Sequence, residues 1–407
     1  GKVSGARVIL RNARTHGIID NQKLDTDGRA RFRVPQTVDS VLVELQGQDD
    51  SRYFDEAKGD RALPRDFSMR AASPISGNLN LGVTLLTEAA VQYAESLPAA
   101  LTNPDNIEEA ARKIGEAVGV DNINQPPALI ASPDDIGRLG DSPGDRYALQ
   151  LAGLVQAATE RTGSDTPALE LARNLSRDLS DGQMDGRDGE TLLTGIPYSP
   201  LPSVFAESWK FGMELMLENV PEGSLKDTLR ADVVDATEVK DTVTSPVVTD
   251  DTDFGGNAGK WKGEIFLLPE NSGALPDFST MTPIGSLYTD EIDITQRAFT
   301  EPFPGVPSNR YEWFAVRYQG PLTVRESGQY TFQTNSDDGS KLYIDDVLVI
   351  NHDGTHGAYD SAAVTVDLSR GVHTVRIEYF QGPRWEIALR VFGNKAGEAR
   401  ALLRPVL

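Results

Sequence analysis

The pattern of apolar and polar positions divides the chain into regions of different periodicity. In residues 1–80, short runs alternate or are rich in β-branched residues, namely GARVIL (5–10), RARFRV (29–34) and SVLVEL (40–45). Such runs are typical of half-buried strands, and DTDGR (25–29) has the composition of a turn. This region is therefore predicted to form a small all-β domain.

Residues 81–230 carry apolar residues at three-and-four spacing, which is the period of an amphipathic helix. Asn103, Ser142 and Thr166 each precede a proline, which places a capping residue before Pro at the first helical position. We expect a small α-helical domain. Its helices should lie within 84–97, 104–118, 143–160, 167–179 and 202–220.

The remaining chain returns to β-type patterns after a connecting segment. Residues 231–257 are rich in Asp and Thr without a stable period, which predicts a linker or an extended connector. The same segment has the composition to add a strand to a neighbour. From 258 to 407, aromatic-rich runs are separated by Gly, Pro, Asn and Asp, which predicts a second all-β domain. The predicted fold class is thus multidomain: an N-terminal β-sandwich, a helical middle and a C-terminal β-sandwich.

Composition limits the functions that the chain can have. Its 407 residues are more than a domain with a single core usually contains. The 61 acidic and 39 basic residues give a formal charge of -22. That charge opposes binding to nucleic acid or to an anionic membrane. The absence of Cys excludes disulfides and thiol chemistry. No run of 18 apolar residues predicts a membrane span, and we infer that a targeting segment is missing before Gly1.

One motif imitates a hydrolase site. GDSPG (140–144) matches the nucleophile pattern G-x-S-x-G. However, Pro143 follows the serine, and proline lacks the backbone N–H that an oxyanion hole needs at that position. Ser142 is therefore interpreted as a helix cap. With no convincing nucleophile–base pair elsewhere, we predict that the chain is not an enzyme.

The adjacent acids Asp337 and Asp338 are the strongest candidate for chemistry. They follow the alternating run GQYTFQTN (328–335), and Gly339 permits a tight backbone after them. Two carboxylates on a loop held by strands can chelate Ca²⁺, which takes six to eight oxygens and tolerates irregular geometry. The cation would also remove the repulsion between the acids. Taken alone, the pair also fits an exposed acidic turn.

The surrounding motifs resemble a known family. FPGVP, EWFAVRYQG, GQYTFQTNSDDGSKLYID, VINHDGTHG and LSRGVHTVRIEYFQGP are similar in order and spacing to the PA14 domain, over residues 258–398. The similarity is greatest to lectin-type PA14 domains of bacterial adhesins and yeast flocculins, and it implies a jelly-roll-like β-sandwich. Residues 1–80 more loosely resemble the carboxypeptidase-regulatory-like β-sandwich modules of bacterial surface proteins.

The PA14 resemblance implies a calcium site built from two loops. Asp337 and Asp338 would be joined by a cis peptide bond and bind Ca²⁺ directly. The second loop, QGPRW, would contribute the side-chain oxygen of Gln381 and carbonyls near Pro383 and Trp385. The metal expected in this domain is therefore Ca²⁺.

A sugar with vicinal hydroxyls would then replace water on the ion, with the two aspartates accepting hydroxyl hydrogens. Arg384 is a candidate donor to a sugar oxygen, and Trp385 or Tyr359 could pack on a ring face. Asp353 and His356 are candidate contacts from the loop NHDGTHGAYD. Whether Trp385 instead points into the core stays open at this point.

These inferences predict a calcium-dependent carbohydrate-binding protein of the bacterial cell surface, or a secreted one, that mediates adhesion to glycans. A structural subunit of a surface filament or pilus tip, which uses PA14 as a scaffold and self-associates or binds assembly partners, is the first alternative. A glycosidase accessory role is the second, and the helical region looks too small for a glycosidase barrel.

Overall fold

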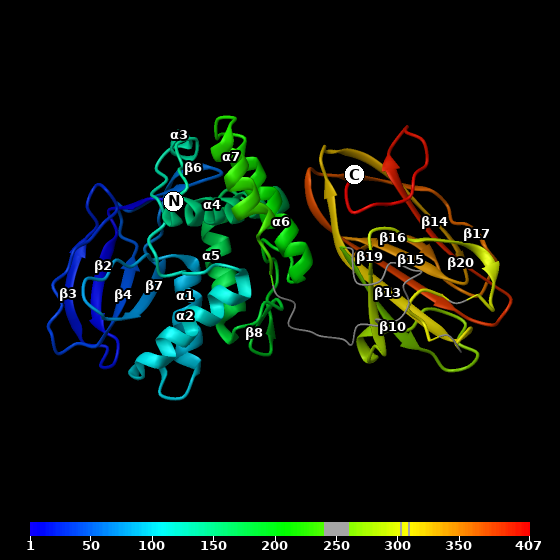
Figure 1. The fold of residues 1–407 in the computed structure, drawn as a ribbon, viewed down its shortest axis with the longest axis horizontal. Helices are drawn as coiled ribbons and strands as arrows, with labels where there is room; N and C mark the ends of the chain where they lie inside the picture. Colours follow the sequence, from blue (N-terminus) through cyan, green and yellow to red (C-terminus); the bar gives the residue numbers. More distant parts are fainter. Residues whose placement is uncertain (240–259, 302, 308–309) are drawn as a thin grey trace. The chain divides into compact units, whose positions relative to one another are not determined.

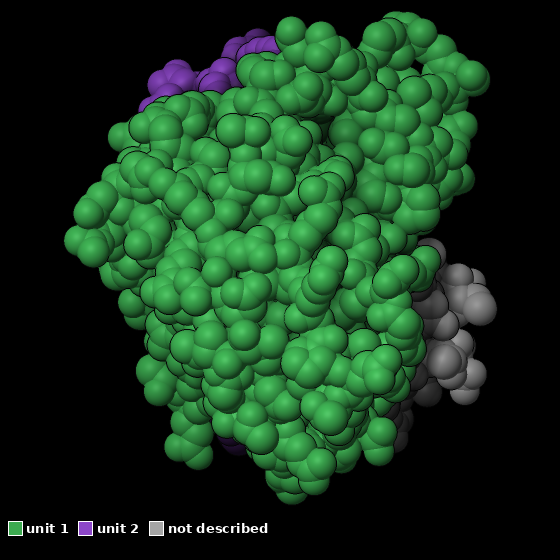
Figure 2. All heavy atoms as spheres, turned by 90° about the vertical axis from the view of Figure 1, so that its left-hand side faces the viewer, with its two compact units in different colours: residues 1–242 green, residues 243–407 purple. Residues whose placement is uncertain are grey.

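The computed structural model describes residues 1–239, 260–301, 303–307 and 310–407 (Figure 1). The chain divides into two compact units, Gly1–Thr242 (unit 1) and Val243–Leu407 (unit 2), which Figure 2 colours separately. The buried apolar residues of unit 1 form their own core cluster, separate from those of unit 2. No described helix is long and apolar enough to cross a membrane.

Unit 1 begins with antiparallel β structure. One sheet has the order β3-β2-β4-β7, and a smaller sheet has the order β1-β5-β6. The predicted strands at 5–10 and 40–45 correspond to β2 and β4. The bounds are β1 Val3–Ser4, β2 Arg7–Asn12, β3 Ile18–Lys23, β4 Ser40–Gln46, β5 Arg52–Asp55, β6 Gly59–Ala62 and β7 Ser68–Pro74.

The prediction of a strand at 29–34 is wrong, because no strand is present there. The alternating pattern is real, but a strand also needs a neighbour that completes its main-chain hydrogen bonds. Strand β2 pairs instead with β3 on one side and with β4 on the other. The turn predicted at 25–29 is closed by a hydrogen bond from the Asp25 N–H to the Arg29 carbonyl, at 3.0 Å.

Helices follow in unit 1, and each of the five predicted segments contains one. Asn103 and Ser142 cap their helices through side-chain oxygens, whereas the Thr166 side chain makes no such bond. The bounds are α1 Leu85–Ser96, η1 Ala100–Thr102, α2 Pro104–Val118, α3 Pro133–Ile136, α4 Pro143–Thr162, α5 Pro167–Asp178, η2 Leu179–Asp181, β8 Arg187–Asp188, β9 Thr191–Leu192, α6 Pro202–Leu217, α7 Ser224–Leu229 and η3 Arg230–Asp235.

The sheet and the helices of unit 1 share one core. Leu42 of β4 and Leu86 of α1 belong to the same buried cluster. Where α1 packs on β7, the Arg70 guanidinium binds the Glu88 carboxylate, with Nη2 2.8 Å from Oε1. The segments predicted as separate domains, 1–80 and 81–230, therefore pack as one body. Of the predicted linker 231–257, the first residues lie in η3, and the part from 240 onward falls outside the described residues.

Unit 2 is a β-sandwich, as predicted. Its sheets have the orders β11-β10-β13-β19-β15-β16 and β12-β20-β14-β17, with β18 also paired to β14. The bounds are β10 Trp261–Leu267, η4 Phe278–Thr280, β11 Gly285–Thr289, β12 Asp293–Ala298, β13 Phe314–Val324, β14 Gly328–Asp337, β15 Ser340–Ile344, β16 Val347–His352, β17 Tyr359–Asp360, β18 Val364–Leu368, β19 Gly371–Gln381 and β20 Glu386–Lys395.

Alternate residues of both sheets point into one core. Phe332 of β14 and Leu389 of β20 meet Val316 of β13 and Ile377 of β19 there, and all four are buried. The chain crosses between the sheets where β14 ends and β15 begins. The two aspartates of the candidate site occupy this crossing, so both sheets hold the ends of the connection.

Candidate functional site

Asp337 and Asp338 lie at the end of β14. The peptide bond between them is cis, as the PA14 resemblance implied. Only 5% of Asp337 and 2% of Asp338 is exposed. Gly339 follows because its neighbours leave no room for a side chain: a Cβ there would lie 2.6 Å from the Phe380 ring. The acids therefore sit in a tightly packed connection rather than in an exposed turn.

The surroundings of the two carboxylates disfavour their charges. Burial and the charge of Asp338 raise the pKa of Asp337 to about 7, and Glu386 adds to the effect. Burial also raises the pKa of Asp338. In the part of the chain that the structure describes, neither carboxylate forms an ion pair with Lys or Arg. A bound cation would supply the missing compensation.

Asp338 joins three loops. Its Oδ2 accepts a hydrogen bond from the Gly382 N–H at 2.7 Å, and its Oδ1 accepts one from the His356 N–H at 3.0 Å. A carboxylate oxygen has two lone pairs, so each oxygen keeps one for a further ligand. Residues 337–339, the loop after β16 and the loop after β19 are thus held around the same carboxylate.

Gln381, the last residue of β19, is fully buried beside the aspartates. Its Nε2 donates to the Glu386 carbonyl at 3.1 Å and lies 3.4 Å from the Pro383 carbonyl. Its Oε1 is 2.6 Å from the Tyr379 hydroxyl, which also lies 2.5 Å from the Asp337 carbonyl. A phenol has one hydrogen to donate, so one of these two oxygens lacks a hydrogen-bond donor there.

Sequence reasoning did not identify Tyr379. Its ring stacks on Phe303 at a centroid distance of 5.1 Å, and the residue is fully buried. In the sequence it looks like an ordinary core aromatic of a strand, and the only signal was its position two residues before Gln381. The structure shows that its hydroxyl connects the two loops of the candidate site.

Asp353 and Arg384, two other predicted site residues, form hydrogen bonds to other side chains or main-chain groups. Asp353 accepts hydrogen bonds from the Lys341 ammonium at 2.8 Å and from the Leu275 N–H at 2.9 Å, so both of its oxygens have partners. Arg384 binds Glu312 with three hydrogen bonds, of 3.0 Å from Nε, 2.6 Å from Nη2 and 3.2 Å from its backbone N–H. This ion pair lowers the pKa of Glu312.

Aromatic rings stand near the aspartates. Trp385 is 79% exposed, which answers the open question of its direction in favour of solvent. On the loop after β16, the His356 ring stacks on His352 with centroids 4.3 Å apart and lies 4.7 Å from the Tyr359 ring. Tyr359 is 54% exposed. Two exposed aromatic surfaces are therefore available to a ligand.

The donor set suits a hard cation. Among the described residues, no cluster of three or more His, Asp or Glu side chains forms a metal site. The two carboxylates could be joined only by neutral oxygens, of which Gln381 Oε1 and the Asp337 carbonyl lie close to each other around Tyr379. Two charges with several neutral oxygens are typical of Ca²⁺ sites, and such a set fits zinc poorly.

A family-model comparison agrees with the fold of unit 2. Residues 304–399 match the family model of the PA14 domain. No curated protein matches the chain. Among solved structures, an anti-sigma factor domain-containing protein is 23% identical, with a TM-score of 0.30, over 36% of this chain and 47% of that one. This chain thus spans less than half of that protein.

Two further structures are similar over the same share of this chain. A PA14 sugar-binding domain from an RTX adhesin is 18% identical over 36% of this chain and 96% of that one, with a TM-score of 0.31. The A domain of epithelial adhesin 9 from Candida glabrata, in complex with Galβ1-4GlcNAc, is 12% identical over 35% and 85%, with a TM-score of 0.28.

Proposed function

Because residues 304–399 form a PA14 domain, we propose that unit 2 binds carbohydrate through a calcium ion held at Asp337 and Asp338. One observation carries the proposal: two adjacent carboxylates are buried at a point where three loops meet, and no described Lys or Arg pairs with either of them. In this proposal the chain is a secreted or cell-surface protein of a bacterium, and it mediates adhesion to glycans that carry vicinal hydroxyls.

The proposed ligands of the ion are the carboxylates of Asp337 and Asp338, the Gln381 side-chain oxygen, and carbonyls near Pro383 and Trp385. When bound, Ca²⁺ would supply positive charge and coordination positions for ligand oxygens. The carboxylates would accept hydrogen bonds from sugar hydroxyls. The burial of both acids keeps water from competing for these bonds.

Neighbouring side chains would orient the sugar. Trp385 and Tyr359 offer exposed ring faces to the apolar side of a pyranose. Within the described residues the Arg384 Nη1 donates no hydrogen bond, and Arg384 is a proposed donor to a sugar oxygen. His356 and Asp353 also remain proposed contacts, although their observed hydrogen bonds mainly hold the loops in place.

Substitution of Asp338 by Asn tests the proposal. We expect the full chain to bind Ca²⁺ in isothermal titration calorimetry and to bind glycans on an array in calcium but not in chelator. Asp338→Asn should lose both activities, because removal of one of two charges weakens a divalent site strongly. Circular dichroism should show an unchanged fold.

The matched control is Asp346→Asn. Asp346 is exposed in the turn between β15 and β16, where φ is 63°, a conformation that Asn adopts readily. The Asp346→Asn variant should bind calcium and glycans with the same affinity as the wild type. Wild-type glycan affinity in Asp338→Asn would contradict the mechanism, and calcium-independent self-assembly without glycan binding would favour the scaffold function instead.

A further inference from the structure

A segment of unit 1 has the sequence of a strand but pairs with no strand of the described residues. Residues 29–35 contain no helix, strand, turn or bend. A hydrogen bond from the Arg29 N–H to Asp25, at 2.8 Å, anchors the start of the segment, and one from the Val38 N–H to the Pro35 carbonyl anchors its end. A hydrogen-bonded turn therefore flanks the segment at each end.

Most main-chain groups between these anchors have no hydrogen-bond partner within the described part of the chain. From Ala30 to Val34, only the Arg31 carbonyl has one, the Gln22 side-chain amide of β3 at 2.6 Å. Unpaired main-chain groups on an extended segment are the feature by which a further strand is added to a protein. Because no described strand pairs with this segment, a strand of a partner protein could pair with it instead.

Arginines recur along this segment at every second position. Arg29, Arg31 and Arg33 are exposed, whereas Ala30 and Phe32 between them are partly buried. In an extended chain, residues two apart point to the same side. None of the three guanidinium groups has an ion pair or hydrogen bond to another described residue. They form a row of uncompensated positive charges, which we call the arginine row.

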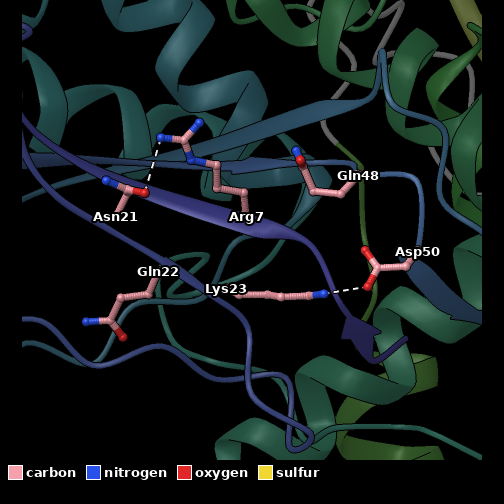
Figure 3. A pocket seen from close by; sticks show the side chains of 6 residues that line it. All are labelled: Arg7, Asn21, Gln22, Lys23, Gln48 and Asp50. Atoms are coloured by element: carbon pink, nitrogen blue, oxygen red, sulfur yellow. Dashed lines mark hydrogen bonds and ion pairs between the residues drawn. The ribbon is translucent and has the colours of Figure 1, made fainter.

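Nearby basic residues differ in this respect. Figure 3 shows the pocket beside β2 and β3, where the Lys23 ammonium pairs with Asp50. In the same pocket, the Arg7 guanidinium donates to the Asn21 side-chain oxygen at 3.1 Å. The two cationic side chains of that pocket each have a partner within it, so their charges are less available than those of the arginine row.

The row is also unusual for this protein. Residues 1–34 contain eight Lys or Arg and three Asp, for a formal charge of +5, whereas the whole chain carries -22. Solubility does not require a positive region in an acidic protein. A local positive potential attracts a negatively charged partner.

We propose that Arg29–Val34 binds an acidic peptide segment of a partner protein as an added strand, with Asp or Glu at every second position. Side chains on one face of a strand are about 6.6–6.8 Å apart, so an alternating acidic peptide matches the arginine row position by position. Cross-strand pairs of opposite charge stabilise such an arrangement. The free main-chain groups of residues 30–34 add the strand hydrogen bonds. This interaction is independent of calcium.

The first test measures binding of two labelled peptides to the full chain by fluorescence polarisation. The peptide TDVEVDT alternates its acids, and TVDEDVT has the same composition with the acids adjacent. We expect the alternating peptide to bind at least about tenfold more tightly, and to weaken as salt rises from low to physiological concentration. Equal binding of the two peptides would overturn the proposal.

Charge reversal locates the site. The triple variant Arg29→Glu, Arg31→Glu and Arg33→Glu should bind the alternating peptide at least about tenfold more weakly. A control triple with the same change of charge, Arg65→Glu, Arg138→Glu and Arg173→Glu, alters exposed arginines elsewhere on unit 1 and should bind within about twofold of wild type. Loss of binding in both triples would reduce the effect to net charge and overturn the assignment.

Hydrogen exchange on the wild type tests strand addition itself. Added peptide should slow exchange of the amides of residues 30–34, because they become hydrogen-bonded. Binding without protection there would overturn the strand geometry. Heparin and a single-stranded oligonucleotide serve as polyanion probes: if either binds as tightly as the alternating peptide, the site recognises charge alone and the proposal fails.

Discussion

Neutralising Asp337 is expected to stabilise the calcium-free protein while it abolishes calcium binding. The pKa of this carboxyl is about 7, against 3.8 for an unperturbed Asp, mainly because of burial and of the neighbouring Asp338. A group with a raised pKa in the folded state contributes its stability below pH 3.8 and loses it as pH rises to about 7. Asn resembles the protonated acid and does not titrate, so Asp337→Asn should keep this stability at high pH.

The size of the effect follows from the two pKa values. One pKa unit corresponds to about 1.4 kcal/mol, so a pKa of about 7 instead of 3.8 gives at most about 4 kcal/mol at pH 8. Relaxation of the site around the charge reduces the expected gain in unfolding free energy to about 1–3 kcal/mol. The gain should shrink toward zero at pH 4.

Urea unfolding of the full chain in EDTA, followed by tryptophan fluorescence, measures this gain. Trp261, Trp313 and Trp385 report on unit 2, and Trp209 lies in unit 1. The unit 1 transition should not change. In excess calcium the order should reverse, because the ion binds only the folded wild type and stabilises it by mass action.

Two results would refute the reasoning. If Asp337→Asn is less stable than wild type at pH 8 in EDTA, the carboxylate is not strained by burial. If its advantage is as large at pH 4 as at pH 8, the gain does not come from ionisation. Asp346→Asn, which changes an exposed turn, should alter stability little at either pH.

Three further predictions concern single side chains. Tyr379→Phe removes the hydroxyl beside the Asp337 carbonyl and Gln381. It should weaken calcium binding about tenfold and lower the free energy of unfolding by about 1 kcal/mol. Terbium luminescence titration measures the affinity, and an unchanged affinity would show that the hydroxyl only supports packing. Trp385→Ala should change the free energy of unfolding by less than about 0.5 kcal/mol, since the ring is exposed. It should lower glycan affinity about tenfold and leave calcium affinity unchanged. Glycan titrations that give the same affinity for variant and wild type would exclude the ring as a sugar contact. Gly212→Ala would place a Cβ 2.0 Å from the Gly153 carbonyl where α6 crosses α4. It should therefore destabilise unit 1 by about 1–3 kcal/mol and leave calcium binding unchanged. Calorimetry of the full chain measures both.

Local pattern was sufficient for the five longest described helices and for strands such as β2 and β4. Every predicted helical segment contains a helix, because apolar residues at helical spacing can all be buried on one face only when the segment is helical. Capping residues such as Ser142 mark where a helix begins. The PA14 motifs also led to the Asp337–Asp338 pair and its cis peptide bond. These features depend on residues close together in the sequence.

Long-range contacts decided the rest. The Arg70–Glu88 pair joins β7 to α1, so the segments before and after residue 80 share a core that no local period reveals. Tyr379 reaches Asp337 only because β19 lies next to the crossing between the sheets.

The sequence by itself determined where the five longest described helices and strands such as β2 and β4 form, and which two acids carry the candidate chemistry, because periodicity and motifs are local properties. Only the tertiary structure decided that these acids are buried without an ion pair to a described Lys or Arg, that Trp385 is exposed, and that residues 29–34 have no strand partner among the described residues. Burial and pairing depend on distant parts of the chain, and the free energy of a charge or of a main-chain hydrogen bond depends on both.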